Sequence, residues 1–193
     1  MTIALELALG GNADGRPAVV APPHPLYGGR MDNPVVTTAA KALADAGYAT
    51  LRFNWRGVGR SEGAASGRIE DGVADYRHAL DEALAGGAKH VLAAGYSFGA
   101  ACALLAALDE ERVERLVLVA PPVKMLDAVD IASFERPIVA IVGANDQFAP
   151  VDQLAQVLGR ARDARLDVVP DADHFFSMPF WIARVAELVR AAV

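Results

Sequence analysis

Short apolar runs rich in β-branched residues alternate with longer amphipathic segments along the 193-residue chain. Runs of the first kind predict strands, whereas apolar positions that recur every three or four residues predict helices. We expect strands at Thr2–Leu9, Ala18–Ala21, Ala49–Asn54, His90–Tyr96, Val113–Ala120, Ile138–Gly143 and Leu166–Val169. We expect helices at Val35–Ala46, Ile69–Ala85, Phe98–Leu108, Asp152–Ala161 and Phe180–Ala192.

Several predicted strands, such as Ile138–Gly143, are continuously apolar, which is typical of parallel strands covered on both faces. The alternation therefore predicts an α/β fold. We expect a mostly parallel, doubly wound sheet of about seven strands flanked by helices, in one domain over residues 1–193. Ligands of such folds bind at the carboxyl ends of the strands, so functional residues should directly follow a strand.

Composition narrows the possible functions. Hydrophobic residues make up 53% of the chain and charged residues 22%, as in a globular protein. The net charge of −6 and the lack of a basic stripe argue against a nucleic-acid partner. Cys102 is the single cysteine, which excludes an intrachain disulfide and a cysteine-based zinc site. It lies in an apolar run, where we expect an inert core thiol.

Two segments could suggest targeting or cofactor binding. Residues Met1–Glu6 have no basic region and carry an early glutamate, so we expect no signal peptide and a cytoplasmic protein. Residues 53–63 include two glycines spaced as in a dinucleotide-binding turn. The third glycine, Gly63, is out of register and no helix follows directly, so we expect no cofactor.

The segment Gly95–Gly99 reads GYSFG, between a buried strand and a buried helix. Glycines at both ends allow a very sharp turn, which would project the Ser97 hydroxyl above the sheet beside a helix N-terminus. This context predicts a nucleophile rather than an incidental serine. The surrounding uncharged run Val91–Leu108 is nominally long enough to span a membrane, but it divides into a strand and a helix, so we expect no membrane span.

A serine nucleophile requires a base. His78 lies within a helical pattern, His90 begins the strand that leads to Ser97, and His24 is held between two prolines. His174 follows the last predicted strand and can approach Ser97 from a loop. Elimination therefore favours His174 as the base, although a structural histidine is the usual alternative.

The base requires a carboxylate that holds its tautomer. Asp146 follows the strand Ile138–Gly143 and is our candidate, with helix capping or an Asx turn as its alternative role. Asp171 and Asp173 are nearer to His174 in sequence, but a short loop rarely lets adjacent side chains meet as a triad requires. These residues have no distant partner ligand, so we expect no metal site. The order serine, aspartate, histidine is the order of an α/β-hydrolase.

Stabilisation of an oxyanion requires two backbone N–H groups. The first should be that of Phe98, directly after Ser97. The second should come from the loop that follows the strand Ala18–Ala21. Pro25 cannot donate, so Leu26 is our first choice and Tyr27 our second. We expect His24 to brace this loop through hydrogen bonds of its side chain.

With these residues in place, the whole chain resembles the α/β-hydrolase superfamily, and within it the small bacterial serine hydrolases without a cap that are similar to dienelactone-hydrolase-like esterases. The segments that carry the resemblance are HPLYGGRMDN (24–33), LRFNWRGVGRSEG (51–63), GYSFGA (95–100), GANDQFAP (143–150) and DADHFF (171–176). The chain departs from the family pattern with Pro25 in place of a common glycine and Asn54 in place of a common aspartate.

The resemblance implies a three-layer fold, a nucleophile at Ser97, an acid at Asp146 and a base at His174. Superfamily lids are commonly inserted where this chain has only residues 121–137, so no large lid and an open site are expected. Its walls should include Leu26, Tyr27, Tyr96, Phe98, Pro122, Met125, Phe148, Phe175 and Phe176, each of which could equally be a core residue. The triad predicts a carboxylesterase, and an open apolar cleft suits small acyl or aryl esters better than long lipids. A thioesterase, amidase, acyltransferase or non-catalytic binding protein are the alternatives.

Overall fold

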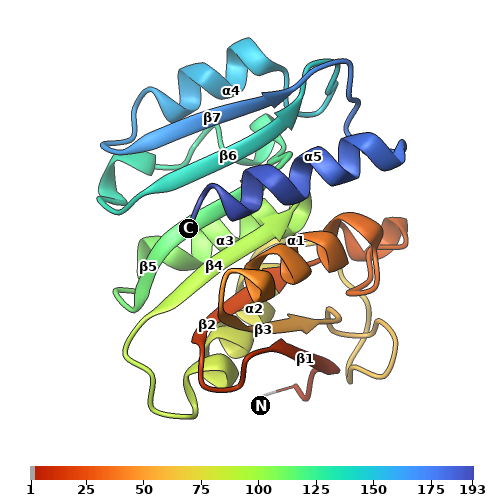
Figure 1. The fold of residues 1–193 in the computed structure, drawn as a ribbon. Helices are drawn as coiled ribbons and strands as arrows, with labels where there is room; N and C mark the ends of the chain where they lie inside the picture. Colours follow the sequence, from red (N-terminus) through yellow and green to blue (C-terminus); the bar gives the residue numbers. More distant parts are fainter. Residues whose placement is uncertain (1–2) are drawn as a thin grey trace.

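The computed structural model of the protein describes residues 3–193. Its central sheet has seven strands in the order β1-β3-β2-β4-β5-β6-β7 (Figure 1). They are β1 Leu7–Gly11, β2 Arg16–Ala21, β3 Tyr48–Phe53, β4 Val91–Tyr96, β5 Val113–Val119, β6 Ile138–Gly143 and β7 Ala164–Val169. All neighbouring strands pair in parallel except β1, which is antiparallel to β3. The predicted fold class is confirmed.

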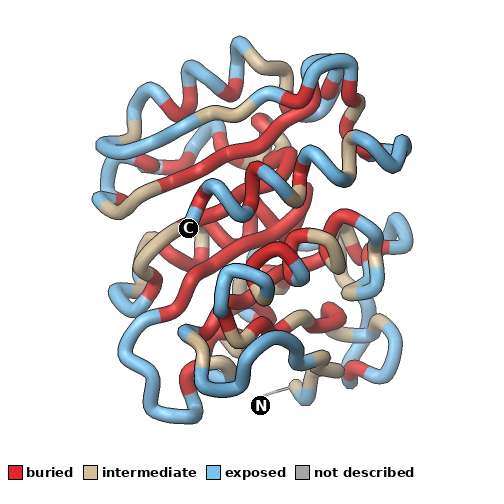
Figure 2. The backbone as a smooth tube through the Cα atoms, in the orientation of Figure 1, coloured by how far each residue is buried: buried red, intermediate tan, exposed pale blue. Residues whose placement is uncertain are grey.

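Helices cover both faces of the sheet. Their bounds are α1 Pro34–Asp45, α2 Ile69–Leu84, α3 Phe98–Leu108, α4 Val151–Leu158 and α5 Pro179–Arg190. Helices α1 and α5 pack against each other on one face, while α2, α3 and α4 cover the other (Figure 1). The sheet between them is the most deeply buried layer (Figure 2). Apolar side chains on alternating faces of the strands thus form two cores, one against each helical layer.

The first strand differs from its prediction. We expected a strand at Thr2–Leu9, whereas β1 begins at Leu7 and extends to Gly11; Thr2 lies outside the described residues. The backbone of Ala4 and Glu6 bonds instead to the loop after β3, because Glu62 N–H donates to Ala4 O and Asn54 N–H to Glu6 O. Backbone pairing with β3 extends β1 to its glycines without any apolar side chain there.

Residues at the helix ends explain where two of the helices begin or end. Asn33 caps α1, since its side chain accepts a hydrogen bond from Val35 N–H at 2.9 Å, and Pro34 occupies the first helical position. Helix α4 ends at Leu158, three residues before the predicted end, with Gly159 as its cap. Glycine loses more backbone entropy in a helix than other residues, which favours termination there.

Only two short 3-10 turns, Val123–Met125 and Ile131–Ser133, lie between β5 and β6. No α-helix is inserted in this stretch, so it forms no large lid over the carboxyl edge of the sheet. The apolar run Val91–Leu108 is divided between β4 and α3, whose residues are almost all buried. Among residues 3–193, no helix combines the length and the apolarity that crossing a membrane would require.

Candidate active site

Ser97 sits at a strained turn between β4 and α3. Its backbone has φ 55° and ψ −120°, in a region that L-residues rarely adopt. The turn is possible because its flanking residues lack side chains: a Cβ at Gly95 would collide with the carbonyl of Gly99, and a Cβ at Gly99 would collide with that of Pro22. The predicted sharp turn is therefore present, and it holds Ser97 at the carboxyl edge of the sheet.

Three residues from separate strand ends meet at this edge. Ser97 Oγ lies 2.9 Å from His174 Nε2, and His174 Nδ1 lies 2.8 and 3.0 Å from the two carboxylate oxygens of Asp146. The carboxylate can only accept, so it fixes the proton of the neutral ring on Nδ1 and leaves the Nε2 lone pair facing Ser97. In this arrangement His174 can take the hydroxyl proton.

The carboxylate of Asp146 is held by the turn that contains it. Its Oδ1 accepts hydrogen bonds from Phe148 N–H at 2.8 Å and Ala149 N–H at 2.9 Å. Asp146 is 4% exposed and His174 5% exposed, so water screens their interaction little. Asp146 therefore forms an Asx turn, one of its two alternative roles, and also orients the histidine. It does not cap α4, which begins after Pro150.

The loop that carries His174 is bound to its neighbours by hydrogen bonds. Tyr96 Oη donates to the His174 carbonyl at 2.9 Å, and Asn145 Nδ2 donates to the Asp171 carbonyl at 3.2 Å. Burial, together with the charge of Asp146, raises the pKa of Tyr96, so its hydroxyl stays protonated. Sequence reasoning placed Tyr96 only in the substrate pocket. Its bond to the histidine loop had no sequence signal.

Asp171 and Asp173 are not brought to the His174 ring. Asp171 has φ 58° at the start of the loop, and Asp173 Oδ1 accepts a hydrogen bond from Phe175 N–H at 3.0 Å. Within residues 3–193, no three His, Cys, Asp or Glu side chains lie close enough to share a metal ion. Cys102 is buried on α3, and burial raises the pKa of its thiol.

The two N–H groups predicted to bind the oxyanion differ in their hydrogen bonding. Phe98 N–H is the first amide of α3, and such amides have no acceptor within their own helix. Leu26 N–H, in contrast, donates to His24 Nδ1 at 3.2 Å, and Tyr27 N–H donates to the His24 carbonyl at 3.1 Å. His24 does brace the loop, as expected from sequence. Leu26 N–H would have to leave His24 to bind an oxyanion, so its role stays a prediction.

The loop after β2, which carries His24 and Leu26, is held by further contacts. Trp55 Nε1 donates to the Pro23 carbonyl at 2.8 Å, just before His24. His24 stacks edge-on against Phe98, with ring centroids 4.8 Å apart, and burial lowers the pKa of His24. The neutral ring that results can accept from Leu26 N–H, which a doubly protonated imidazole cannot do.

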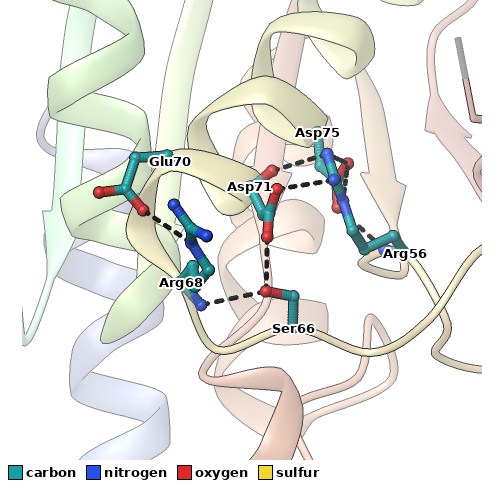
Figure 3. A network of polar contacts seen from close by, with 6 residues as sticks. All are labelled: Arg56, Ser66, Arg68, Glu70, Asp71 and Asp75. Atoms are coloured by element: carbon teal, nitrogen blue, oxygen red, sulfur yellow. Dashed lines mark hydrogen bonds and ion pairs between the residues drawn. The ribbon is translucent and has the colours of Figure 1, made fainter. Parts of the chain in front are cut away.

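A partly buried ion-pair network holds the loop that follows β3 (Figure 3). Arg56 donates to Asp75 through Nε at 2.9 Å and to Asp71 through Nη1 at 2.8 Å, and Ser66 Oγ donates to Asp71. The hydrogen bonds with Asp75 raise the pKa of Arg56. Gly67, next to Ser66, packs so closely against His24 that an added Cβ would lie 2.7 Å from its ring. The network thus supports the loop after β2 that carries His24. Sequence reasoning missed this role.

A cleft of about 590 Å³ opens over Ser97. The residues that line it are Pro23, His24, Tyr27, Gly28, Asn33, Tyr96, Ser97, Phe98, Pro122, Met125, Phe148, His174 and Phe175. Within residues 3–193, this lining includes no Asp, Glu, Lys or Arg. Two residues of the expected walls lie elsewhere: Leu26 is exposed beside the cleft, and Phe176 is fully buried in the core against α1 and α5.

Comparison with known proteins identifies the family. The sequence profile of the family described as serine aminopeptidase, S33 matches residues 33–142. An uncharacterized protein of Rickettsia prowazekii is 34% identical over 170 residues, which cover 82% of this chain and 71% of the relative. The chain belongs to this family of α/β hydrolases.

Solved structures of α/β hydrolases agree with this one over nearly their full length. A serine hydrolase homologue from Coxiella burnetii is 30% identical with a TM-score of 0.87, covering 97% of this hydrolase and 90% of that chain. A serine hydrolase without a lid from Xanthomonas campestris is 29% identical with a TM-score of 0.83, covering 98% and 88%. The open carboxyl edge of the sheet is therefore a feature that this hydrolase shares with a relative.

Proposed function

We propose that this hydrolase cleaves carboxylic esters with small, uncharged acyl or aryl groups. The observation that carries the proposal is the hydrogen-bonded series from Ser97 through His174 to Asp146 at the floor of an apolar cleft. A hydroxyl in contact with an oriented imidazole is the arrangement that acyl transfer requires.

In the proposed mechanism, His174 Nε2 takes the proton of Ser97 Oγ while the oxygen attacks the ester carbonyl. Asp146 stabilises the imidazolium that forms, and Phe98 N–H stabilises the oxyanion. The tetrahedral intermediate collapses, its carbon–oxygen bond to the alcohol breaks, and His174 gives its proton to the departing oxygen. Water then attacks the acyl-enzyme by the same steps, which releases the acid and restores Ser97.

The chemistry of the cleft separates esters from the substrates that the family description suggests. An aminopeptidase binds a peptide with a free, positively charged amino group, and a desolvated ammonium needs an anionic partner. Among the described residues, the cleft lining offers no carboxylate for that purpose. An uncharged acyl group pays no such desolvation cost, so esters and thioesters fit the cleft better than peptides with free amino ends.

Replacement of the nucleophile tests the proposal. We expect Ser97→Ala to lose at least about 1,000-fold in kcat for short p-nitrophenyl esters, because the acyl-enzyme cannot form. A fluorophosphonate probe should label the wild type and not the variant. Wild-type turnover by Ser97→Ala would refute the mechanism, and an unlabelled wild type without esterase activity would indicate a binding protein. Thioesters and anilides with the same acyl groups identify the preferred bond.

A further inference from the structure

Two partly exposed phenylalanines flank the ring of His174. The Phe148 and Phe175 ring centroids lie 4.7 and 5.5 Å from that of the histidine. The two rings also meet each other nearly edge to face, at 6.4 Å. Phe148 is 48% exposed and Phe175 57% exposed, and both line the cleft. They come from separate loops, after β6 and after β7.

The two side chains are not needed to form the loops that carry them. The hydrogen bonds of these residues within their loops come from the backbone, since Phe148 N–H donates to Asp146 and Phe175 N–H donates to Asp173. The phenylalanines of the core, by contrast, are at most 1% exposed; they are Phe53, Phe98, Phe134 and Phe176. Adjacent exposed aromatic rings in a cleft are a feature of binding sites.

The chemistry of acyl transfer assigns the two rings to one side of the substrate. His174 must return its proton to the departing alcohol oxygen, so that oxygen has to lie beside Nε2 when the carbon–oxygen bond breaks. The group attached to it then lies next to the rings that surround the histidine. The oxyanion, in contrast, points toward the N-terminus of α3 and Phe98 N–H.

We propose that Phe148 and Phe175 form a leaving-group subsite that binds the aromatic alcohol portion of the ester. This inference rests on the proposed esterase function and specifies its substrate class. An aromatic alcohol places its ring against one or both phenylalanines, in the edge-to-face or offset geometry that aromatic pairs prefer. It also covers apolar surface that is otherwise in water. The subsite contains no charge, so a neutral aryl or arylmethyl group fits it.

Esters that differ only in the alcohol test the subsite. Benzyl acetate and methyl acetate share the acyl group, and their alcohols have nearly equal acidity, so the ratio of their kcat/KM values reports contacts of the leaving group. We expect Phe148→Ala and Phe175→Ala each to lower this ratio about tenfold. Cyclohexylmethyl acetate, which is apolar but not aromatic, should be preferred less strongly than benzyl acetate by the wild type.

Phe180→Ala is the matched control. Phe180 is 62% exposed in the first turn of α5 and is not among the residues that line the cleft. Its loss should leave the benzyl-to-methyl ratio unchanged. Equal losses on both esters in the Phe148 and Phe175 variants would overturn the proposal, because the rings would then act through His174. Wild-type activity of these variants on both esters would also overturn it.

The esterase function and the subsite can fail separately. Ser97-dependent cleavage of both acetates, with the same ratio in all phenylalanine variants, would refute only the subsite. Absence of any Ser97-dependent cleavage and of fluorophosphonate labelling would refute the proposed function itself. Urea unfolding of each variant checks that the fold is retained. We expect little change in the free energy of unfolding, because the exposed side chains contribute little to the core.

Discussion

Tyr96 and Tyr76 are two buried tyrosines that use their hydroxyls in different ways. Tyr76 Oη shares its one proton between the carbonyls of Ala94 at 2.8 Å and Val19 at 3.2 Å, which joins α2 to the sheet. Tyr96 Oη donates to the carbonyl of His174. The first bond supports only the fold, whereas the second positions a residue of the candidate site across two intervening strands.

We predict that Tyr96→Phe lowers kcat several-fold with little change in KM, because the His174 loop loses one of its anchors. The control Tyr76→Phe should leave kcat unchanged. Each variant should lower the free energy of unfolding by about 1 kcal/mol, since each leaves a buried carbonyl with one hydrogen bond fewer. Urea unfolding and steady-state ester kinetics measure the two effects. Equal kcat values for both variants would show that Tyr96 acts only on stability.

At the scale of elements, the packing of β4 against α3 determines where the nucleophile lies. The two elements join through Ser97 without a connecting loop, and their close approach depends on Gly95 and Gly99. Helix α3 is apolar on all sides because β4, β5 and α2 surround it. The turn therefore has no room to relax outward.

Gly95→Ala tests this constraint. Its Cβ would meet backbone atoms of Gly99 and Ala100, which cannot rotate away, so we expect a loss of about 3 kcal/mol in the free energy of unfolding and a large loss of kcat. Gly86→Ala is the control, because no atom lies within 4 Å of a Cβ placed there. Thermal unfolding and ester kinetics give the comparison. A stable and active Gly95→Ala would mean that the elbow can shift.

At the scale of the whole molecule, the Glu6 side chain links the N-terminal segment to the loop after β3 by hydrogen bonds. Its Oε2 accepts hydrogen bonds from Asn54 Nδ2 and Arg60 N–H, both at 2.8 Å, and Oε1 accepts from Arg60 Nε at 2.9 Å. These bonds, that of the Arg60 backbone above all, lower the pKa of Glu6 to about 2. The same loop includes Arg56, whose network with Asp71 and Asp75 is drawn in Figure 3.

A lowered carboxyl pKa makes a pH-dependent contribution to stability. The folded state favours ionised Glu6, so its contribution is complete above the unfolded pKa of 4.5 and is lost as the pH falls toward about 2. We predict that Glu6→Gln lowers the free energy of unfolding at pH 7 and that its difference from the wild type shrinks between pH 4.5 and pH 2. Urea unfolding across this pH range measures it.

Glu135→Gln serves as the control for Glu6→Gln. Glu135 pairs with Arg162 at 2.7 Å, but both side chains are more than half exposed, so the pair should contribute less than about 1 kcal/mol at pH 7. A difference between Glu6→Gln and the wild type that stays constant down to pH 2 would contradict the assignment.

Sequence patterns predicted the ends of most elements to within two residues. The signals involved, which are hydrophobic periodicity, glycines and helix caps, depend only on neighbouring residues in the chain. Helix α3 was predicted with its observed bounds. The first strand was predicted, but its bounds were wrong, because the backbone of Glu6 bonds to Asn54, 48 residues away. No local pattern reports such a partner.

The residues of the candidate site could also be predicted from the sequence. Parallel strands bring all their carboxyl ends to one edge, so residues that directly follow strands become neighbours. Ser97, Asp146 and His174 were chosen by that rule, and the structure brings them into contact. The family itself was also recognisable from the quoted segments, and the comparisons confirm it.

The sequence by itself determined the alternation of elements, the sharp turn at Ser97 and the edge at which functional groups gather, because short-range sterics and periodicity decide these. Only the tertiary structure decided which donor meets which acceptor. It turned Tyr96 toward His174, Leu26 N–H toward His24 and Phe176 into the core. Such pairings depend on the positions of strands that are far apart in the chain, to within the few tenths of an ångström that a hydrogen bond tolerates.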